Sequence, residues 1–183
     1  MKSVNMTLFR WAGKWGPFKV NIPCGECALT EAVIDDTLNN ELADVPVELE
    51  VKDWLSCWWQ PLSKGCWHAP IVIVENKVVS QGQALNRGLL TQVVIESHSR
   101  KVPLTGNHIF GKKNCAHCRR TKDYFEKAGI EYRYHDVISD ARALYEMLAR
   151  VKPNIHPKVP VTVPQIWLDG TYIGGADKLN MVI

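Results

Sequence analysis

The chain has 183 residues, enough for one large domain or two smaller ones, and its composition is that of an ordinary soluble globular protein, with 46% hydrophobic and 22% charged residues. Its formal net charge of only +3 gives no case for a nucleic-acid partner or a membrane surface. Residues 1–15 lack the continuous apolar stretch of a signal peptide, and no later run approaches the roughly 20 residues of a membrane span. We therefore expect a cytoplasmic protein.

The first half of the chain begins with a strand predicted over residues 6–12, a loop rich in glycine, tryptophan and proline, and an alternating apolar run over 18–22. A first C-x-x-C pair follows, and apolar residues at helical spacing predict an amphipathic helix over 28–38. Alternation of apolar and charged residues over 47–52 predicts a half-exposed strand.

Residues 54–68 are rich in tryptophan and also contain Cys57 and Cys66. Tryptophans spaced four apart predict a short helix with an aromatic face. Ala69-Pro70 then precedes a hairpin predicted over 71–80, with a two-residue loop at its centre. A helix over about 83–97 follows, and the polar segment 99–106 is predicted to be a linker.

The second half opens with a short apolar run over 109–111 and a second pair, Cys115-Ala116-His117-Cys118. A helix predicted over 119–128 and ended by Gly129 follows this pair. The remaining elements are a strand over 130–134, a helix over 141–151 that we expect Ser139 to cap, and a proline-rich loop. A hairpin over 165–173 follows, and a short last helix begins at 174–177 and ends at 183.

The second cysteine pair lies in the first turn of its predicted helix. Backbone N–H groups there have no intrahelical partner and carry the positive end of the helix dipole, so they favour a thiolate over a thiol. A second thiol one turn away can attack the mixed disulfide that the first one forms. The spacing therefore predicts dithiol redox chemistry.

Landmarks of the first half recur in the second in the same order, displaced by about 91 to 94 residues. The pairs of landmarks are Cys24 with Cys115, Pro70 with Pro164, and Gly82 with Gly175. This nearly constant displacement predicts two copies of one structural unit. Each unit would consist of a strand, a helix and a strand, followed by a hairpin and a last helix. We expect two domains, over residues 1–98 and 107–183.

These landmarks resemble the thioredoxin-like fold, and the second half resembles a glutaredoxin. The resemblance is carried by four pieces of sequence: Lys112, Cys115-Ala116-His117-Cys118, Thr162-Val163-Pro164 and Gly174-Gly175-Ala176-Asp177. It implies an α/β protein of two tandem thioredoxin-like domains, each a central mixed β-sheet flanked by helices. It also implies a thiol-disulfide oxidoreductase that uses glutathione as co-substrate, without a metal, and acts on disulfide-containing or glutathionylated proteins.

The same resemblance implies a role for each matching residue. Cys115 becomes the nucleophile and Cys118 the resolving thiol, and a cis peptide before Pro164 exposes the Val163 backbone to glutathione. Lys112 would meet a glutathione carboxylate, the N–H groups following Gly175, including that of Ala176, would hold the γ-glutamyl carboxylate, and Asp177 would meet the amino group. His117 stands where the family usually has an aromatic residue, and a protonated imidazole there would stabilise the thiolate.

The first half is similar to a more divergent thioredoxin-like domain, with Cys24, Cys27 and Ala69-Pro70 matching the pattern. No acid equivalent to Asp177 is found there, and Glu26 would oppose a nearby thiolate. Two alternatives stay open for this half: a docking module for clients that uses its tryptophan-rich face, and a zinc site in which Cys57 and Cys66 join Cys24, Cys27 or His68.

Overall fold

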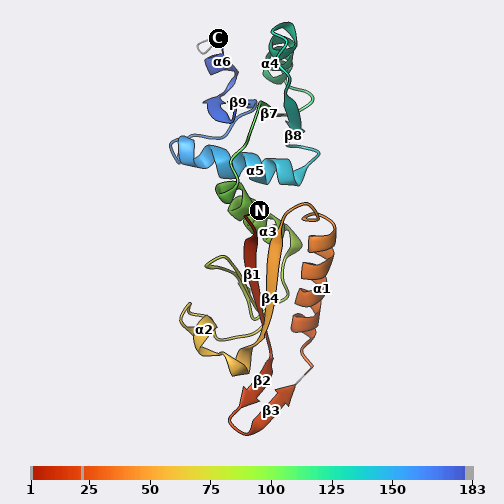
Figure 1. Cartoon of the computed structure of the whole chain (residues 1–183), viewed down its shortest axis with the longest axis vertical. Helices are drawn as coiled ribbons and strands as arrows, with labels where there is room; N and C mark the ends of the chain where they lie inside the picture. Colours follow the sequence, from red (N-terminus) through yellow and green to blue (C-terminus); the bar gives the residue numbers. More distant parts are fainter. Residues whose placement is uncertain (1, 22, 180–183) are drawn as a thin grey trace. The chain divides into compact units, whose positions relative to one another are not determined.

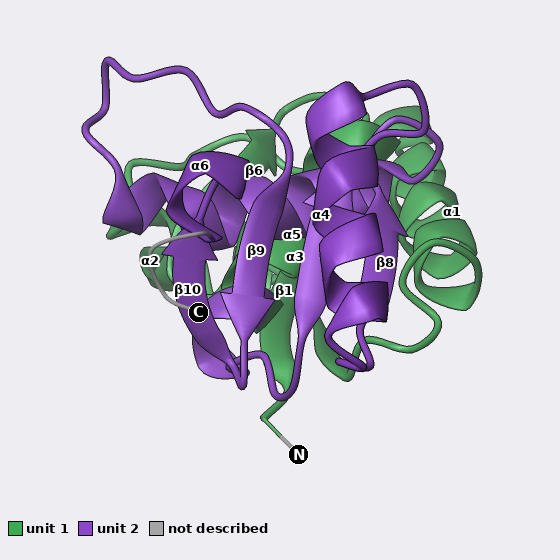
Figure 2. Cartoon of the chain, turned by 90° about the horizontal axis from the view of Figure 1, so that it is seen from above, with its two compact units in different colours: residues 1–98 green, residues 99–183 purple. Residues whose placement is uncertain are grey.

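A computed structural model of the chain describes residues 2–21 and 23–179. Its contacts divide the chain into two compact units, residues 1–98 and 99–183, which Figure 2 draws in green and purple. No helix in the described part of the chain is long and apolar enough to cross a membrane.

Unit 1 contains a mixed four-stranded sheet with the strand order β4-β1-β5-β6. The central strand β1 runs parallel to β4 and antiparallel to β5, and β5 and β6 form the hairpin that the sequence predicts. The strands are β1 (Val4–Arg10), β4 (Val47–Asp53), β5 (Ile71–Val74) and β6 (Lys77–Gln81). Helix α1 (Gly25–Asn39) connects the parallel pair and lies beside β4 in Figure 1.

A separate hairpin interrupts unit 1 between β1 and the first cysteine pair. It consists of β2 (Ala12–Trp15) and β3 (Phe18–Asn21), which pair antiparallel with each other and form their own two-stranded sheet (Figure 1). The strand expected over 6–12 therefore ends at Arg10, and part of the expected loop is a strand. Gly13 explains why β1 ends early. Its φ of +126°, which side-chain-bearing residues rarely adopt, turns the chain away from the direction of β1. A Cβ at this position would also lie only 2.6 Å from Ser56 Oγ.

The tryptophan-rich segment forms two short helical turns instead of one helix, η1 (Trp54–Ser56) and α2 (Trp59–Leu62). They cover a buried cluster of Phe9, Cys66, Ile71 and Ile73, against which Trp54 and Cys57 pack. Helix α3 (Arg87–Lys101) begins four residues later than expected and ends within the 99–106 segment, so the start of that segment is helical.

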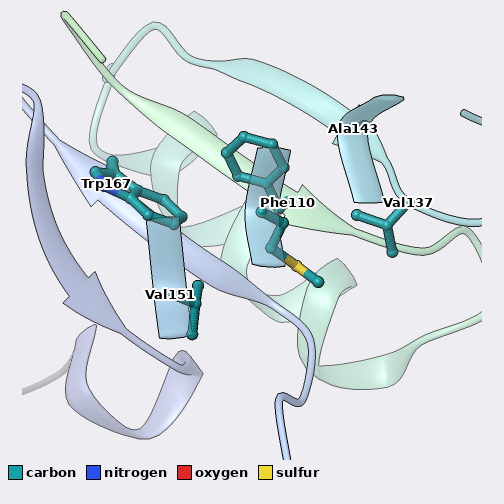
Figure 3. Close-up of a cluster of buried hydrophobic side chains, with 6 residues drawn as sticks. Phe110, Val137, Ala143, Val151 and Trp167 are labelled. Atoms are coloured by element: carbon teal, nitrogen blue, oxygen red, sulfur yellow. The ribbon is translucent and has the colours of Figure 1, made fainter. Parts of the chain in front are cut away.

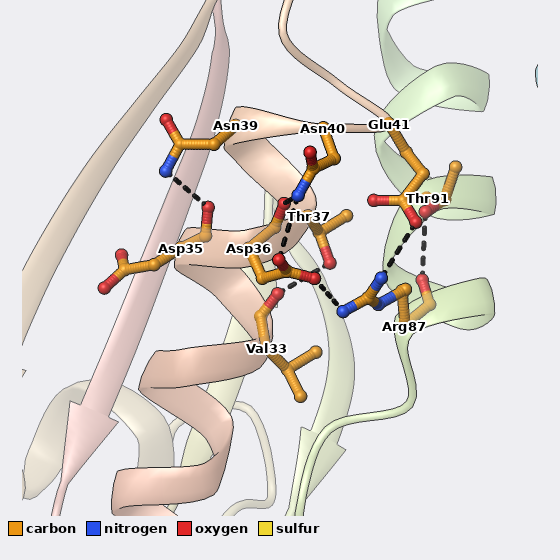
Figure 4. A network of polar contacts seen from close by, with 9 residues as sticks. All are labelled: Val33, Asp35, Asp36, Thr37, Asn39, Asn40, Glu41, Arg87 and Thr91. Carbon is orange, nitrogen blue, oxygen red and sulfur yellow. Dashed lines mark hydrogen bonds and ion pairs between the residues drawn. The ribbon is translucent and has the colours of Figure 1, made fainter.

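Helices α1 and α3 are joined at one end by a network of polar contacts (Figure 4). The guanidinium of Arg87 on α3 forms ion pairs with Asp36 on α1 and, at 3.1 Å, with Glu41 just after it. Asn40 donates to the carboxylate of Asp36 from its side-chain amide, so the same group also anchors the end of α1.

Unit 2 contains a second mixed sheet, with the strand order β8-β7-β9-β10, equivalent to that of unit 1. Its strands are β7 (His108–Gly111), β8 (Arg133–Asp136), β9 (Gln165–Leu168) and β10 (Thr171–Gly174). Its helical elements are α4 (Ala116–Lys127), α5 (Ala141–Val151), η2 (Lys152–Asn154) and α6 (Ala176–Leu179). Strand β8 begins three residues later than expected, and residues 180–183 of the last helix expected here lie outside the described residues.

The core of unit 2 lies between its sheet and α5 (Figure 3). Phe110 on β7 meets Trp167 on β9 edge to face, with 5.2 Å between the ring centroids. The remaining buried members of this cluster are Val137, Ala143, Met147 and Val151. Asp140, and not Ser139, caps α5, because its carboxylate accepts a hydrogen bond from the Arg142 N–H at 2.9 Å.

The predicted fold class is confirmed. Each unit has a central mixed β-sheet of four strands flanked by helices, and in each a parallel strand–helix–strand unit is followed by an antiparallel hairpin. This topology places the start of the first helix of each unit at the carboxyl end of the central strand. Both cysteine pairs lie there.

Candidate active site

Cys115 is the N-cap of α4, and its sulfur accepts hydrogen bonds from backbone N–H groups in the first turn of that helix. The Cys118 N–H donates to Cys115 Sγ at 3.3 Å, in the position that a capping oxygen usually takes. Cys115 Sγ also lies 3.9 Å from the carbonyl oxygen of Val163, in the loop before β9. The half-buried sulfur is therefore held between a helix N-terminus and this loop.

The surroundings of Cys115 favour its ionised form. Burial acts to raise the pKa of this thiol, but hydrogen bonds from Cys118 and the backbone N–H of His117, together with the charge of Lys112, outweigh it and lower the pKa. A thiol with a lowered pKa supplies more thiolate near neutral pH, and the thiolate is the nucleophilic form.

Cys118 is the opposite kind of thiol. Only 1% of its surface is exposed, and burial, followed by the interaction with Cys115, raises its pKa to about 11. The two thiols therefore differ in acidity, with Cys115 ionising at a lower pH than Cys118.

The loop beside Cys115 has the geometry that the resemblance implies. The peptide between Val163 and Pro164 is cis. Behind it, Gly175 approaches the loop so closely that a Cβ would lie 3.8 Å from the Pro164 carbonyl oxygen and 2.7 Å from Asp177 Oδ1. The structure thus brings Val163, Pro164, Gly175 and Asp177 to one side of Cys115.

A hollow of about 460 Å³ lies along α4 next to this loop, and it is lined by His117, Ala176 and Asp177 among others. His117 accepts a hydrogen bond at Nδ1 from the guanidinium of Arg120, at 2.8 Å. The backbone N–H of His117 is one of the donors that lower the pKa of Cys115. Stabilisation of the thiolate by a protonated imidazole of His117 stays a prediction.

The site in unit 1 repeats the backbone arrangement of the site in unit 2. Cys24 is the N-cap of α1 and accepts from the Cys27 N–H at 3.4 Å, and the peptide between Ala69 and Pro70 is also cis. Cys27 is buried, and its pKa is raised to about 11 by burial and then by Cys24. Its sulfur accepts a hydrogen bond from the Trp11 N–H at 3.4 Å.

The charges around the two pairs differ. Glu26 lies beside Cys24, with 3.7 Å between Oε2 and Sγ, where it accepts from the thiol. Asn21 occupies the sequence position equivalent to Lys112, three residues before the first cysteine. The unit 1 site therefore has a carboxylate next to its outer thiol, whereas the unit 2 site has an ammonium group nearby.

Comparison with known proteins now decides the family. The glutaredoxin family model matches residues 108–173. Glutaredoxin 3 of Escherichia coli K12 is 31% identical over 71 residues, which are 39% of this chain and 77% of that protein. The chain belongs to the glutaredoxin family.

Solved glutaredoxins are also similar to this chain. A buckwheat glutaredoxin in complex with glutathione has a TM-score of 0.40 at 21% identity and covers 50% of this chain and 79% of its own. Reduced Escherichia coli glutaredoxin has a TM-score of 0.34 at 28% identity and covers 42% of this chain and 89% of its own.

The thiols of Cys57 and Cys66 form their hydrogen bonds with backbone carbonyls and not with the two C-x-x-C pairs. The thiol of Cys57 donates to the Asp53 carbonyl at 3.2 Å, and that of Cys66 to the Lys64 carbonyl at 3.7 Å. Within the described residues, no group of three or more histidine, cysteine, aspartate or glutamate side chains is placed to hold a metal ion. The zinc set considered from the sequence is therefore not assembled there.

Sequence reasoning missed three residues of this glutaredoxin site. Arg120 had a local signal, since it stands one helical turn after His117. Gly111 and Tyr134 had none, because their closeness to Cys118 depends on how β7 and β8 pair.

Proposed function

We propose that this chain is a glutathione-linked thiol-disulfide oxidoreductase, with Cys115 as nucleophile and Cys118 as resolving thiol. The observation that carries the proposal is the contrast between the two thiols. Cys115 is half-buried with a lowered pKa beside the Val163 carbonyl, and Cys118 is buried with a pKa of about 11 one turn further on. This is the asymmetry that ordered dithiol exchange requires.

The proposed reaction on a glutathionylated protein has two steps. The Cys115 thiolate attacks the glutathione sulfur, the bond to the protein sulfur breaks, and the released protein thiolate takes a proton from solvent. Cys118 then loses its proton to solvent and attacks Cys115 Sγ, which releases glutathione thiolate and leaves a Cys115–Cys118 disulfide. Two further glutathione molecules reduce this disulfide and become oxidised glutathione.

Glutathione itself is proposed to bind across the cis-proline loop and the hollow along α4. Lys112 is exposed next to Cys115 and offers a positive charge to a carboxylate. The Val163 backbone faces Cys115 Sγ, while Gly175, Ala176 and Asp177 border the same region and would receive the γ-glutamyl group. His117 also lines the hollow.

Glutathione-dependent reduction of the mixed disulfide of glutathione and 2-mercaptoethanol tests this proposal. Cys115→Ser removes the nucleophile and should lower the rate at least 100-fold, whereas Cys57→Ser, on a thiol bonded to a backbone carbonyl, should leave it unchanged. Retained activity in the Cys115→Ser chain would show that the assignment is wrong.

For unit 1 we propose a second dithiol centre, with Cys24 as nucleophile, Cys27 as resolving thiol and Ala69-Pro70 beside them. The proposal treats 1–98 and 107–183 as two domains joined by 99–106. It is supported by the shared arrangement of an N-capping thiol, a buried second thiol and a cis-proline loop. In a reducing compartment C-x-x-C pairs are more often catalytic or metal-binding than structural, and the proposal includes a cytoplasmic location and disulfide-containing protein substrates.

A docking role for unit 1 is the second candidate, and exposed tryptophans favour it. Trp58, Trp59 and Trp67 have 40%, 55% and 66% of their surface exposed, and Trp67 stands just before the Ala69-Pro70 loop. Rates of protein-disulfide reduction separate the two roles. A loss in Cys24→Ser supports the dithiol centre, whereas full activity in Cys24→Ser with a raised KM in Trp67→Ala supports docking.

A further inference from the structure

Tyr134 on β8 has a buried hydroxyl that the fold leaves unpaired. The oxygen is sealed from solvent, and it finds no hydrogen-bond partner among the described residues. A buried hydroxyl without a partner costs roughly 1 to 3 kcal/mol, so such a group calls for an explanation.

The unpaired hydroxyl and the Cys118 thiol border the same small space above Gly111. A Cβ built on Gly111 would lie 2.9 Å from Tyr134 Oη and 3.1 Å from Cys118 Sγ. Any larger residue at position 111 would therefore crowd both groups. With glycine there, the buried phenol oxygen and the buried resolving thiol border one space that no side chain from position 111 fills.

The tyrosine keeps its proton and so has a hydrogen to donate. Burial, followed by the negative charges of Cys118 and Asp136, raises its pKa to about 12, so the hydroxyl keeps its proton at physiological pH. The ring is fixed on one side by the ammonium group of Lys122, 4.8 Å from its centroid, and it packs against the cluster of Ile109 and Phe125. The hydroxyl hydrogen is free to rotate about the C–O bond toward the sulfur.

We propose that Tyr134 is a positioning residue for the resolving step, and that its hydroxyl donates a hydrogen bond to the Cys118 sulfur when that thiol loses its proton. The inference rests on the proposed function, since it concerns the second step of that reaction. The proton of Cys118 goes to solvent, its sulfur forms a bond with Cys115 Sγ, and glutathione leaves as a thiolate. Hydrogen bonds to a charged group are about twice as strong as neutral ones, so the donor selectively stabilises the attacking form.

The test follows glutathione on Cys115 in the full-length chain. The reduced protein is mixed with oxidised glutathione, quenched at successive times, alkylated, and the peptide carrying Cys115 is quantified by mass spectrometry across a range of pH. Appearance of the adduct measures the first step, and its conversion into the Cys115–Cys118 disulfide measures the second. Cys118→Ser identifies the second phase, because there the adduct should persist.

Tyr134→Phe removes only the hydroxyl and should slow the second phase about tenfold at pH 7, with its pH midpoint moved upward by about one unit and the first phase unchanged. Tyr132→Phe is the matched control, because it removes a tyrosine hydroxyl just before the same strand that is bonded to Glu126 at 3.1 Å, and it should leave both phases unchanged. Gly111→Ala is a second variant, which places a methyl group against both the phenol and the thiol and should also slow only the second phase.

An unchanged second phase and pH midpoint in Tyr134→Phe would overturn the assignment, since a merely structural hydroxyl would not move them. If Tyr134→Phe fails to fold, an unchanged second phase in Gly111→Ala overturns it instead. If Cys115 of the unaltered chain acquires no glutathione at all, the proposed function itself fails and Tyr134 loses its role with it.

Discussion

At the scale of single residues, Cys115 and Cys118 show how one helical turn can hold two thiols of opposite character. Cys115 caps the helix and receives donors from the backbone, whereas Cys118 lies within the helix and is sealed beneath it. The same contrast in burial recurs at Cys24 and Cys27, so it follows from the position of the pair at the helix start and not from the residues between the cysteines.

Alkylation by iodoacetamide should reveal this asymmetry in the reduced chain. Cys115 has a lowered pKa and should react at pH 7 at least tenfold faster than Cys118, whose pKa of about 11 keeps it protonated. Quantification of each cysteine peptide by mass spectrometry measures both rates, and the rate at Cys118 should rise steeply only as the pH approaches 11.

Lys112→Met provides a control for the electrostatic part of this argument. Because Lys112 is exposed and only one of several contributions to the lowered pKa, its loss should reduce the rate at Cys115 by less than tenfold. Equal reactivity of Cys115 and Cys118 in the unaltered chain would contradict the proposed division of roles.

At the scale of elements, α5 holds the β7 strand in place from behind, and so supports the segment that leads into the active site. Its buried face meets Phe110 and Trp167 through Ala143, Met147 and Val151 (Figure 3). Gly111 directly follows Phe110, and the catalytic pair follows four residues later.

Met147→Ala should therefore destabilise unit 2 by about 2 to 5 kcal/mol, because Met147 is 2% exposed and its truncation leaves a cavity in the core. Hydrogen exchange of peptides from β7 and α5 measures the effect. Tyr145→Ala on the partly buried side of the same helix is the matched control and should cost less. An unchanged exchange rate in Met147→Ala would show that α5 does not support the sheet.

Sequence patterns predicted those parts of the fold that depend on near neighbours in the chain. The hairpin over 71–80 and the helix after each cysteine pair belong to this group, whereas the cis peptide before Pro164 was expected from the resemblance and the one before Pro70 was not predicted. The β2–β3 hairpin was missed because its departure from β1 depends on Gly13 packing against Ser56, which is distant in sequence. Asp140 replaced Ser139 as the cap because both are suitable residues and the pattern does not separate neighbours.

The candidate site, like the fold, was predicted where it depends on local motifs and missed where it depends on strand pairing. The cysteines and the cis-proline loop could be placed from motifs, whereas Tyr134 reaches Cys118 only through the pairing of β7 with β8.

At the scale of the whole molecule, the stability of unit 2 should depend on pH through the imidazole of His135, which stacks on His108. His135 lies between His108 and Phe110, and its Nε2 is 2.9 Å from His108 Nδ1. Burial lowers the pKa of His135, and His108 and Arg133 act in the same direction, while Glu146 and Asp140 oppose them. The folded unit therefore favours the neutral ring.

The sign of the effect follows from this lowered pKa. Above about pH 6.5 the histidine is neutral in both the folded and the unfolded chain, so its contribution to stability is fully present. Below that pH the unfolded chain binds a proton that the folded chain resists, so stability falls as the pH is lowered toward the folded pKa. Hydrogen exchange in β7 and β8 should accelerate between pH 7 and 5, after correction for the intrinsic exchange rate.

His135→Phe should flatten this dependence, because a phenyl ring can occupy the stack without titrating. His156→Asn, at an exposed position, is the control and should keep the slope. A slope that is the same in His135→Phe and in the unaltered chain would assign the pH dependence to other groups.

The most direct test of the central claim is to identify the cysteine that first bonds to glutathione. The Cys118→Ser chain, exposed briefly to oxidised glutathione at pH 7 and analysed by mass spectrometry, should carry one glutathione in unit 2, on Cys115. An unmodified Cys115 in that experiment would contradict the account.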